Sequence, residues 1–177
     1  MRRPIPLSRR KLDWVFVGFF AFNLLFVSYN ISLEQLVVAD PARFAYPVWP
    51  PKPVIDAVHW WGRSFDPLLM ARPPFFRSTI WIDVLYFGPF YAFALAAWVR
   101  GRDGIRNWAL IWSGLMFANV SAILFEEWLG VHASPTPWTA TLANGAWLVF
   151  PFLVAWRVWR EHPFTEPADA GRPPAGA

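Results

Sequence analysis

The chain has 177 residues, of which 56% are hydrophobic and 16% charged, whereas a soluble domain carries about 25% charged residues. Cysteine is absent, which excludes disulfides, a thiol nucleophile and a Cys-ligated metal. The net charge of +4 does not indicate a nucleic-acid partner, because the Lys and Arg residues flank apolar blocks, as they do in membrane proteins.

Four apolar blocks follow one another along the chain, and each is long enough to cross a bilayer core, which takes about 20 helical residues. The first block is too long for the apolar region of a signal peptide and is interpreted as a retained helix. The blocks predict one all-α domain over residues 1–160, a polytopic membrane four-helix bundle. The alternative is a soluble protein with four fully buried helices. The expected helices cover residues 14–33, 78–99, 105–129 and 138–159.

The segments outside these blocks have distinct compositions. Residues 34–77 contain eight prolines, so continuous helix is excluded over most of this loop. Residues 54–65 are the exception and predict a short amphipathic helix in the membrane interface, followed by a helical turn at Leu68–Met70. Residues 161–177 are rich in Pro, Ala and Gly and predict a disordered cytoplasmic tail.

The basic residues predict the orientation of the bundle. Eleven Lys and Arg residues lie on the side of the two termini, and five lie in the loop 34–77 on the other side. By the positive-inside rule both termini are cytoplasmic, and the loop is not. The membrane expected is a bacterial inner membrane or the endoplasmic reticulum.

Asp83 lies inside the second apolar block. A charged side chain at the bilayer centre costs about 2.5–3.5 kcal/mol, so Asp83 should face the bundle interior. Counted from the non-cytoplasmic side, Asp83 and Asn144 lie at similar depths, Glu126 lies near the end of its helix, and Asp66 lies in the loop on that side. This grouping predicts an acidic, aromatic cavity in the non-cytoplasmic half of the bundle.

Helical spacing refines the list of candidate residues. Asn119 and Glu126 share one face of the third helix, Asn144 and Trp147 share one face of the fourth, and Glu127 is expected to point elsewhere. The candidates for acid–base chemistry are Asp83 and Glu126. The predicted ligand-binding residues are Asn30, Asp66, Asp83, Tyr86, Asn119, Asn144 and Trp147.

Each candidate also has a purely structural interpretation. Asp83 could be a hydrogen-bonding residue of the core, Asp66 a helix cap, and Asn144 a contact between helices. Glu126 and Glu127 could be ordinary interfacial acids at a helix end. His59 and His132 are expected to be exposed loop residues, and His162 lies in the tail and is expected to have no functional role. No metal site and no cofactor are expected, since the sequence has neither clustered ligands nor a Gly-rich phosphate loop.

Three segments resemble a known family of membrane proteins. They are HWWGRSFDPLLMARPPFFRSTIWIDVLYFGPFYAFAL at residues 59–95, LFEEWLG at residues 124–130 and NGAWLVFP at residues 144–151. The chain is similar in them to receptor-type and sterol 8,7-isomerase-type members of the EXPERA family, over about residues 12–160. The resemblance implies a four-helix bundle with a lipid-accessible pocket, often in a homodimer.

The resemblance also implies roles for particular residues. Asp66 and Asp83 would line the pocket, Asn144 and Trp147 would lie near a sterol, and Asp83 would shuttle protons in an isomerase. Family members carry a His and a carboxylate on the first helix, and here Asn23 and Asn30 are the nearest polar residues to those positions.

These observations favour a membrane protein that binds a sterol-like or terpenoid lipid, and lipophilic amines, because an aromatic pocket with a few carboxylates suits a cationic or carbocation-like centre. One alternative is a sterol or terpenoid isomerase that moves a double bond by carboxylate acid–base chemistry. A second alternative is a structural membrane subunit without a ligand.

Overall fold

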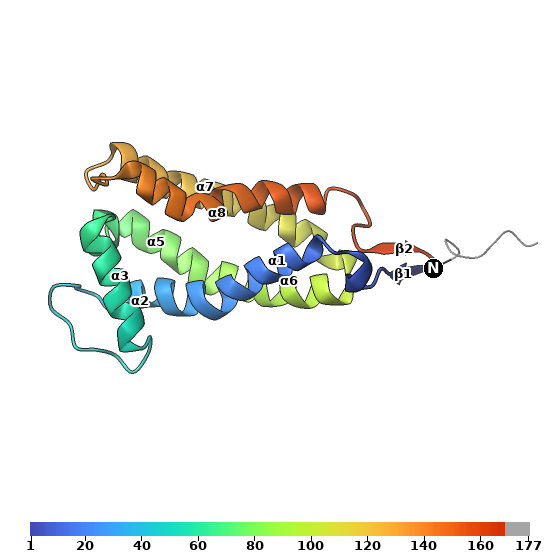
Figure 1. Ribbon diagram of the computed structural model, residues 1–177, viewed down its shortest axis with the longest axis horizontal. Coiled ribbons are helices and arrows are strands. Elements are labelled where there is room, and N and C mark those ends of the chain that lie inside the picture. The colour runs from blue at the N-terminus through green and yellow to red at the C-terminus, as the bar shows by residue number, and fades with distance from the viewer. Residues whose placement is uncertain (169–177) are drawn as a thin grey trace, which may run out of the picture.

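The computed structural model describes residues 1–168, and it is an elongated bundle of helices (Figure 1). The first long helix runs through α1 (Asp13–Phe22), the π-helical segment η2 (Asn23–Ser32) and α2 (Leu33–Val37). The second runs through α5 (Pro74–Ile82), the π-helical segment η3 (Asp83–Phe87) and α6 (Gly88–Arg100). The third consists of η4 (Asp103–Ile105) and α7 (Arg106–Leu129), and the fourth is α8 (Pro137–Arg157).

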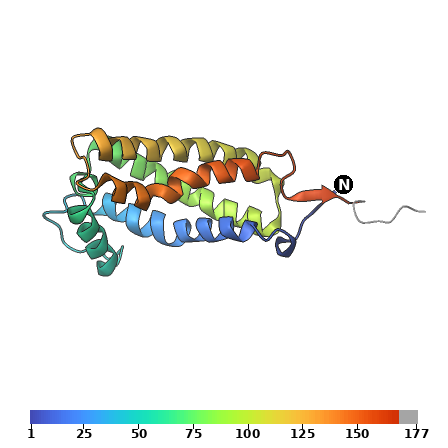
Figure 2. The same cartoon turned by 45° about the horizontal axis from the view of Figure 1, so that its top comes forward.

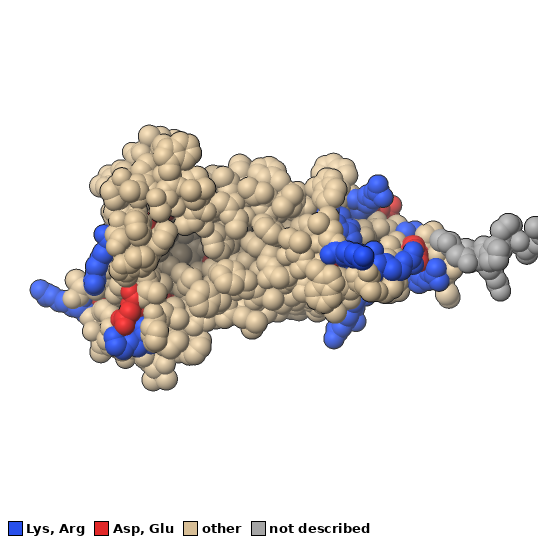
Figure 3. Space-filling view, viewed as in Figure 1, with Lys and Arg blue, Asp and Glu red and all other residues tan. Residues whose placement is uncertain are grey.

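Within residues 1–168, these four helices are long and apolar enough to cross a membrane. Lys, Arg, Asp and Glu gather at the two ends of the molecule, and the surface between them is uncharged on the face shown in Figure 3. The predicted class, an all-α polytopic membrane protein, is therefore confirmed.

The loop between the first two long helices contains α3 (Lys52–Ser64) and α4 (Pro67–Ala71). Both begin with a proline in the first turn, where its missing N–H costs nothing. Gly62 lets α3 approach α4, because a Cβ there would lie 2.7 Å from Met70 Sδ. The helix α3 lies across one end of the bundle, away from the N-terminus (Figures 1 and 2).

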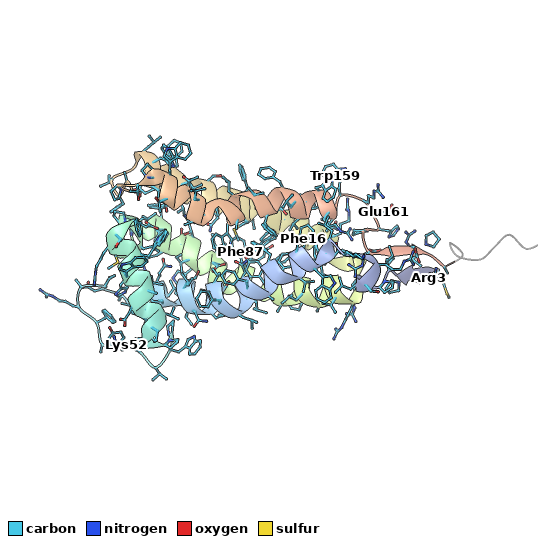
Figure 4. The ribbon with its side chains drawn as sticks, in the orientation of Figure 1. Arg3, Phe16, Lys52, Phe87, Trp159 and Glu161 are labelled. Carbon is cyan, nitrogen blue, oxygen red and sulfur yellow. The ribbon has the colours of Figure 1, made fainter. Side chains whose placement is uncertain are left out.

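Aromatic side chains fill the half of the bundle nearer the N-terminus. Phe20, Trp98 and Trp112 are fully buried there, and Phe19 stacks on Phe150 with ring centroids 3.9 Å apart. Phe16 and Phe87 belong to the same core and point between the helices in Figure 4. This packed half leaves the other half of the bundle as the place for a cavity.

The segment after α8 corrects one expectation. Residues 161–168 are ordered, with β2 (Thr165–Pro167) paired antiparallel to β1 (Arg2–Pro4), which is followed by the short helix η1 (Leu7–Arg9). The order arises because the fully buried ring of Phe164 lies against the guanidinium groups of Arg10 and Arg157, 5.1 and 4.7 Å from its centroid. The rest of the predicted disordered tail, residues 169–177, lies outside the described residues.

Candidate functional site

A cavity of about 590 Å³ lies in the half of the bundle nearer α3. Its walls come from η2, α5, η3, α7 and α8, and α3 covers it with Trp60 and Trp61. Phe87 and Met116 line it on the side of the aromatic core. The surface is hollowed close to the end that carries α3 (Figure 3). The volume falls within the range typical of pockets for small ligands.

Asp83 is held on the cavity wall by hydroxyl groups from the first long helix. Ser28 Oγ donates to Asp83 Oδ1 at 3.2 Å, and Ser32 contacts the same carboxyl group. Asp83 begins η3 and both serines lie in η2, so the contact joins the two π-helical segments. Such segments often occur at functional sites, and here η3 ends two residues before Pro89, which lacks the N–H of a regular helix. The hydrogen-bond partners of Asp83 therefore come from the first long helix.

A second acidic group lies in the cavity wall, where the carboxyl groups of Asp66 and Glu127 contact each other. Glu127 is fully buried and Asp66 is 6% exposed. Asn144 Nδ2 lies 3.5 Å from Glu127 Oε1 and donates to the carbonyl of Ala140 at 3.0 Å. Burial raises the pKa of Asp66 above its ordinary value, because desolvation disfavours the charged form.

Trp147 is fixed on the cavity wall by a hydrogen bond to the first long helix. Its indole N–H donates to Asn23 Oδ1 at 2.7 Å, and Asn23 Nδ2 donates to the carbonyl of Phe19 at 2.8 Å. Asn23 is fully buried, so this contact positions the ring with little freedom.

The family model described as EXPERA (EXPanded EBP superfamily) matches residues 53–158, which is more than half of the chain. The chain belongs to the EXPERA family. The matched segment begins in α3 and extends just past the end of α8, so it includes most of the cavity wall but not the first long helix.

Individual relatives are also similar in sequence. The chain is 29% identical to the human Sigma intracellular receptor 2 over 129 residues, which cover 69% of this chain and 68% of the relative. It is 26% identical to the same receptor of Macaca fascicularis over 129 residues, covering 70% and 68% of the two chains. The receptor of Xenopus tropicalis is 27% identical over 122 residues, covering 68% and 66%.

In this EXPERA protein, five predicted site residues lie on the cavity wall, and three lie elsewhere. Those on the wall are Asp66, Asp83, Asn119, Asn144 and Trp147. Asn30 donates instead to the carbonyl of Leu25 at 3.1 Å, and Tyr86 packs against the aromatic core. Glu126 accepts a hydrogen bond from the backbone N–H of His132 at 3.0 Å, at the turn after α7.

Glu126 was selected because the wrong face of α7 was assigned to the cavity. The cavity-facing residues of α7 include Val120, Ile123 and Glu127, and Asn119 lies at the edge of this face. A face anchored on Asn119 and extended by seven residues selects Glu126, whereas Ile123 extended by four selects Glu127. The acidic residue of α7 that lines the cavity is therefore Glu127, which the sequence prediction had placed on another face.

A buried ionic network beneath α3 was also missed. His59 was expected to be exposed, but it is 4% exposed, and its Nε2 lies 2.9 Å from Glu34 Oε1. Arg72 donates to both oxygens of Glu34 and to the carbonyl of Val38. The apolar residues of α3 at helical spacing, such as Ile55 and Val58, were the signal that this face of the helix is buried.

Proposed function

We propose that this EXPERA membrane protein binds a sterol-like or terpenoid lipid, and also lipophilic amines, in the intramembrane cavity. One observation carries the proposal. Among the residues of the described chain that line the cavity, Asp66, Asp83 and Glu127 bear carboxyl groups, none is Lys, Arg or His, and most of the others are apolar. A ligand with an apolar body and a cationic or hydrogen-bond-donating group complements such a wall.

The interaction energies favour this ligand chemistry. A hydrogen bond between a charged group and its partner contributes about 1.5–3 kcal/mol. A cation on the face of an indole contributes a further 0.5–2 kcal/mol or so, and Trp147 is fixed on the wall of the same cavity as Asp83. The relatives are named as receptors, which also supports ligand binding.

A sterol or terpenoid isomerase is the second candidate function. Moving a double bond requires one carboxylic acid to protonate an alkene carbon and one base to remove a proton from a neighbouring carbon. The carboxyl groups of Asp66 and Glu127, which contact each other on the cavity wall, provide an acid and a base close enough to act on neighbouring carbons. Glu126, the acid first considered for this role, lies outside the wall. A structural subunit without a ligand would need no cavity.

Lipids that co-purify with the protein test the proposal. The protein would be purified in mild detergent, and its bound lipids would be identified by mass spectrometry. We expect a sterol-like or terpenoid lipid in the wild type. We expect it to be absent from Ile123→Trp, which fills the cavity, and present in Ala122→Trp, which adds the same ring at an exposed position next to it. Equal lipid content in the two variants would contradict an intramembrane site.

We also propose that both termini are cytoplasmic. Eleven basic residues lie on their side and five on the other, and β1 and β2 lie at one end of the bundle (Figure 1). Reporter fusions at Ala177 and in the loop at Pro50 test this, and an active cytoplasmic reporter at Pro50 would contradict it.

The homodimer implied by the family resemblance is a further proposal. The spans of α7 and α8 are the most exposed of the four, with 28% and 17% of their most apolar windows buried, so lipid or a second copy must cover them. Light scattering of the purified protein tests this, and a monomer mass in several detergents would contradict it.

A further inference from the structure

The cavity wall contains buried oxygen atoms that lack a hydrogen-bond donor, and they occur at two levels. Asp83 Oδ2 has no partner among the described residues. The same holds for Gln35 Oε1, and for Asp66 Oδ1 and Glu127 Oε2 apart from the contact between their two carboxyl groups. All four side chains line the cavity and are at least nine-tenths buried.

Helix geometry separates the two levels. Asp83 follows the start of α5 at Pro74 by nine residues, which is about 13 Å at 1.5 Å per residue. Glu127 precedes the end of α7 at Leu129 by two residues, and Gln35 precedes the end of α2 at Val37 by two, about 3 Å in each case. These three helix ends lie at the α3 end of the bundle (Figures 1 and 2). The two levels are thus roughly 10 Å apart along the bundle.

Apolar side chains line the wall between the levels, together with Thr79, whose hydroxyl group already donates to the carbonyl of Phe76 at 2.7 Å. Ile80 on α5 and Ile123 on α7 line it there, one turn or so from Asp83 and Glu127 respectively. Below Asp83, Phe87 and Met116 are the lining residues of the aromatic core. A ligand with one polar group would satisfy one level and leave buried acceptors at the other without a donor, which is costly.

We propose that the ligand has two heads: an apolar body with a hydrogen-bond-donating or cationic group at each end, one for Asp83 and one for the Asp66–Glu127–Gln35 level. This inference rests on the proposed function and specifies its ligand class. The inner head binds Asp83 Oδ2, which Ser28 and Ser32 leave free. The outer head binds where α3 covers the cavity.

Rigid steroids with donors at one or both ends are suitable probes. The purified protein would be titrated with androstane-3,17-diol, androstan-3-ol and androstan-17-ol, with binding measured by displacement of a radiolabelled lipophilic amine. A second charge-assisted hydrogen bond corresponds to at least tenfold in affinity, so the diol should bind at least tenfold more tightly than either mono-ol.

Two variants test which carboxyl group binds each head of the ligand. Asp83→Asn and Glu127→Gln should each bring the diol to about the affinity of a mono-ol, and each should weaken only one of the two mono-ols. Glu126→Gln, whose side chain lies outside the cavity wall, serves as the matched control and should leave all three unchanged. Thermal unfolding of each variant verifies that it is folded.

The outcomes separate this inference from the proposed function. A diol that binds no more tightly than the mono-ols, while all of them displace the amine, would overturn the two-headed ligand and leave the proposed function intact. Variants that weaken both mono-ols equally would overturn it as well. A folded protein that binds neither the amine nor any steroid would overturn both.

Discussion

Arg72 Nη2 donates a hydrogen bond to Glu34 Oε2 at 2.8 Å, and both side chains are buried. Arg72 ends α4 in the left-handed conformation, and Glu34 belongs to α2 at the end of the first long helix. His59 of α3 contacts the same carboxylate. This network fixes α3 and α4 on the bundle and thereby holds the cover of the cavity in place.

Glu34→Gln is expected to destabilise the protein strongly, because it leaves the Arg72 guanidinium buried without its counter-ion. Breaking a buried ion pair from one side costs about 3–5 kcal/mol. Thermal unfolding in detergent measures this. Asp56→Asn is the control, because it breaks an exposed ion pair. In this pair Lys52, labelled in Figure 4, has its Nζ 2.7 Å from Asp56 Oδ2. Exposed ion pairs contribute little to stability. Equal unfolding temperatures for the two variants would contradict the structural role of the network.

Asn23→Ala is expected to destabilise the protein by about 1–3 kcal/mol, because it leaves the Trp147 indole N–H without its acceptor. A double-mutant cycle with Trp147→Phe isolates the interaction, and we expect a coupling energy of about 0.5–1.5 kcal/mol. Asn107→Ala serves as the control, at an exposed position where the side chain accepts a hydrogen bond from the adjacent Arg106 at 3.1 Å. Additive effects in the cycle would show that the bond does not position the ring.

The raised pKa of Asp66 predicts how the stability of the protein depends on pH. Its pKa in the folded protein is raised above the ordinary 3.8, so the folded state favours the protonated form. The destabilising effect of its charge is absent below pH 3.8 and grows as the pH rises through the folded-state pKa. Asp66→Asn should therefore unfold at a higher temperature than the wild type at neutral pH, with a difference that closes in acid. A difference independent of pH would contradict the assignment.

The four long helices could be predicted from the sequence because a run of about 20 apolar residues has few other stable structures. The convergence of Asp66, Asp83 and Asn144 on one region followed from counting depth along those helices, and Trp147 was added because it shares a helix face with Asn144. Depth depends only on the axial rise of 1.5 Å per residue, which varies little.

The direction that each side chain faces around the helix axis was less predictable, since successive residues differ in direction by about 100°. This is why Glu126 was selected in place of Glu127, and why Ser28 and Ser32 were missed, since both lie in the π-helical segment η2 with its altered phase. The burial of His59 and the order of residues 161–168 depend on Glu34 and Arg10, partners that are distant in the sequence.

The binding of a lipophilic amine to the cavity carboxylates tests the proposed function most directly. Radiolabelled dodecyldimethylamine would be bound to the purified wild type, to Asp83→Asn and to Glu126→Gln. We expect an affinity about ten- to a hundredfold lower for Asp83→Asn, which keeps the shape of the side chain and removes its charge, and no change for Glu126→Gln. Equal losses in both variants would indicate a diffuse effect of charge, and an unchanged affinity in Asp83→Asn would mean that the site is not in this cavity wall.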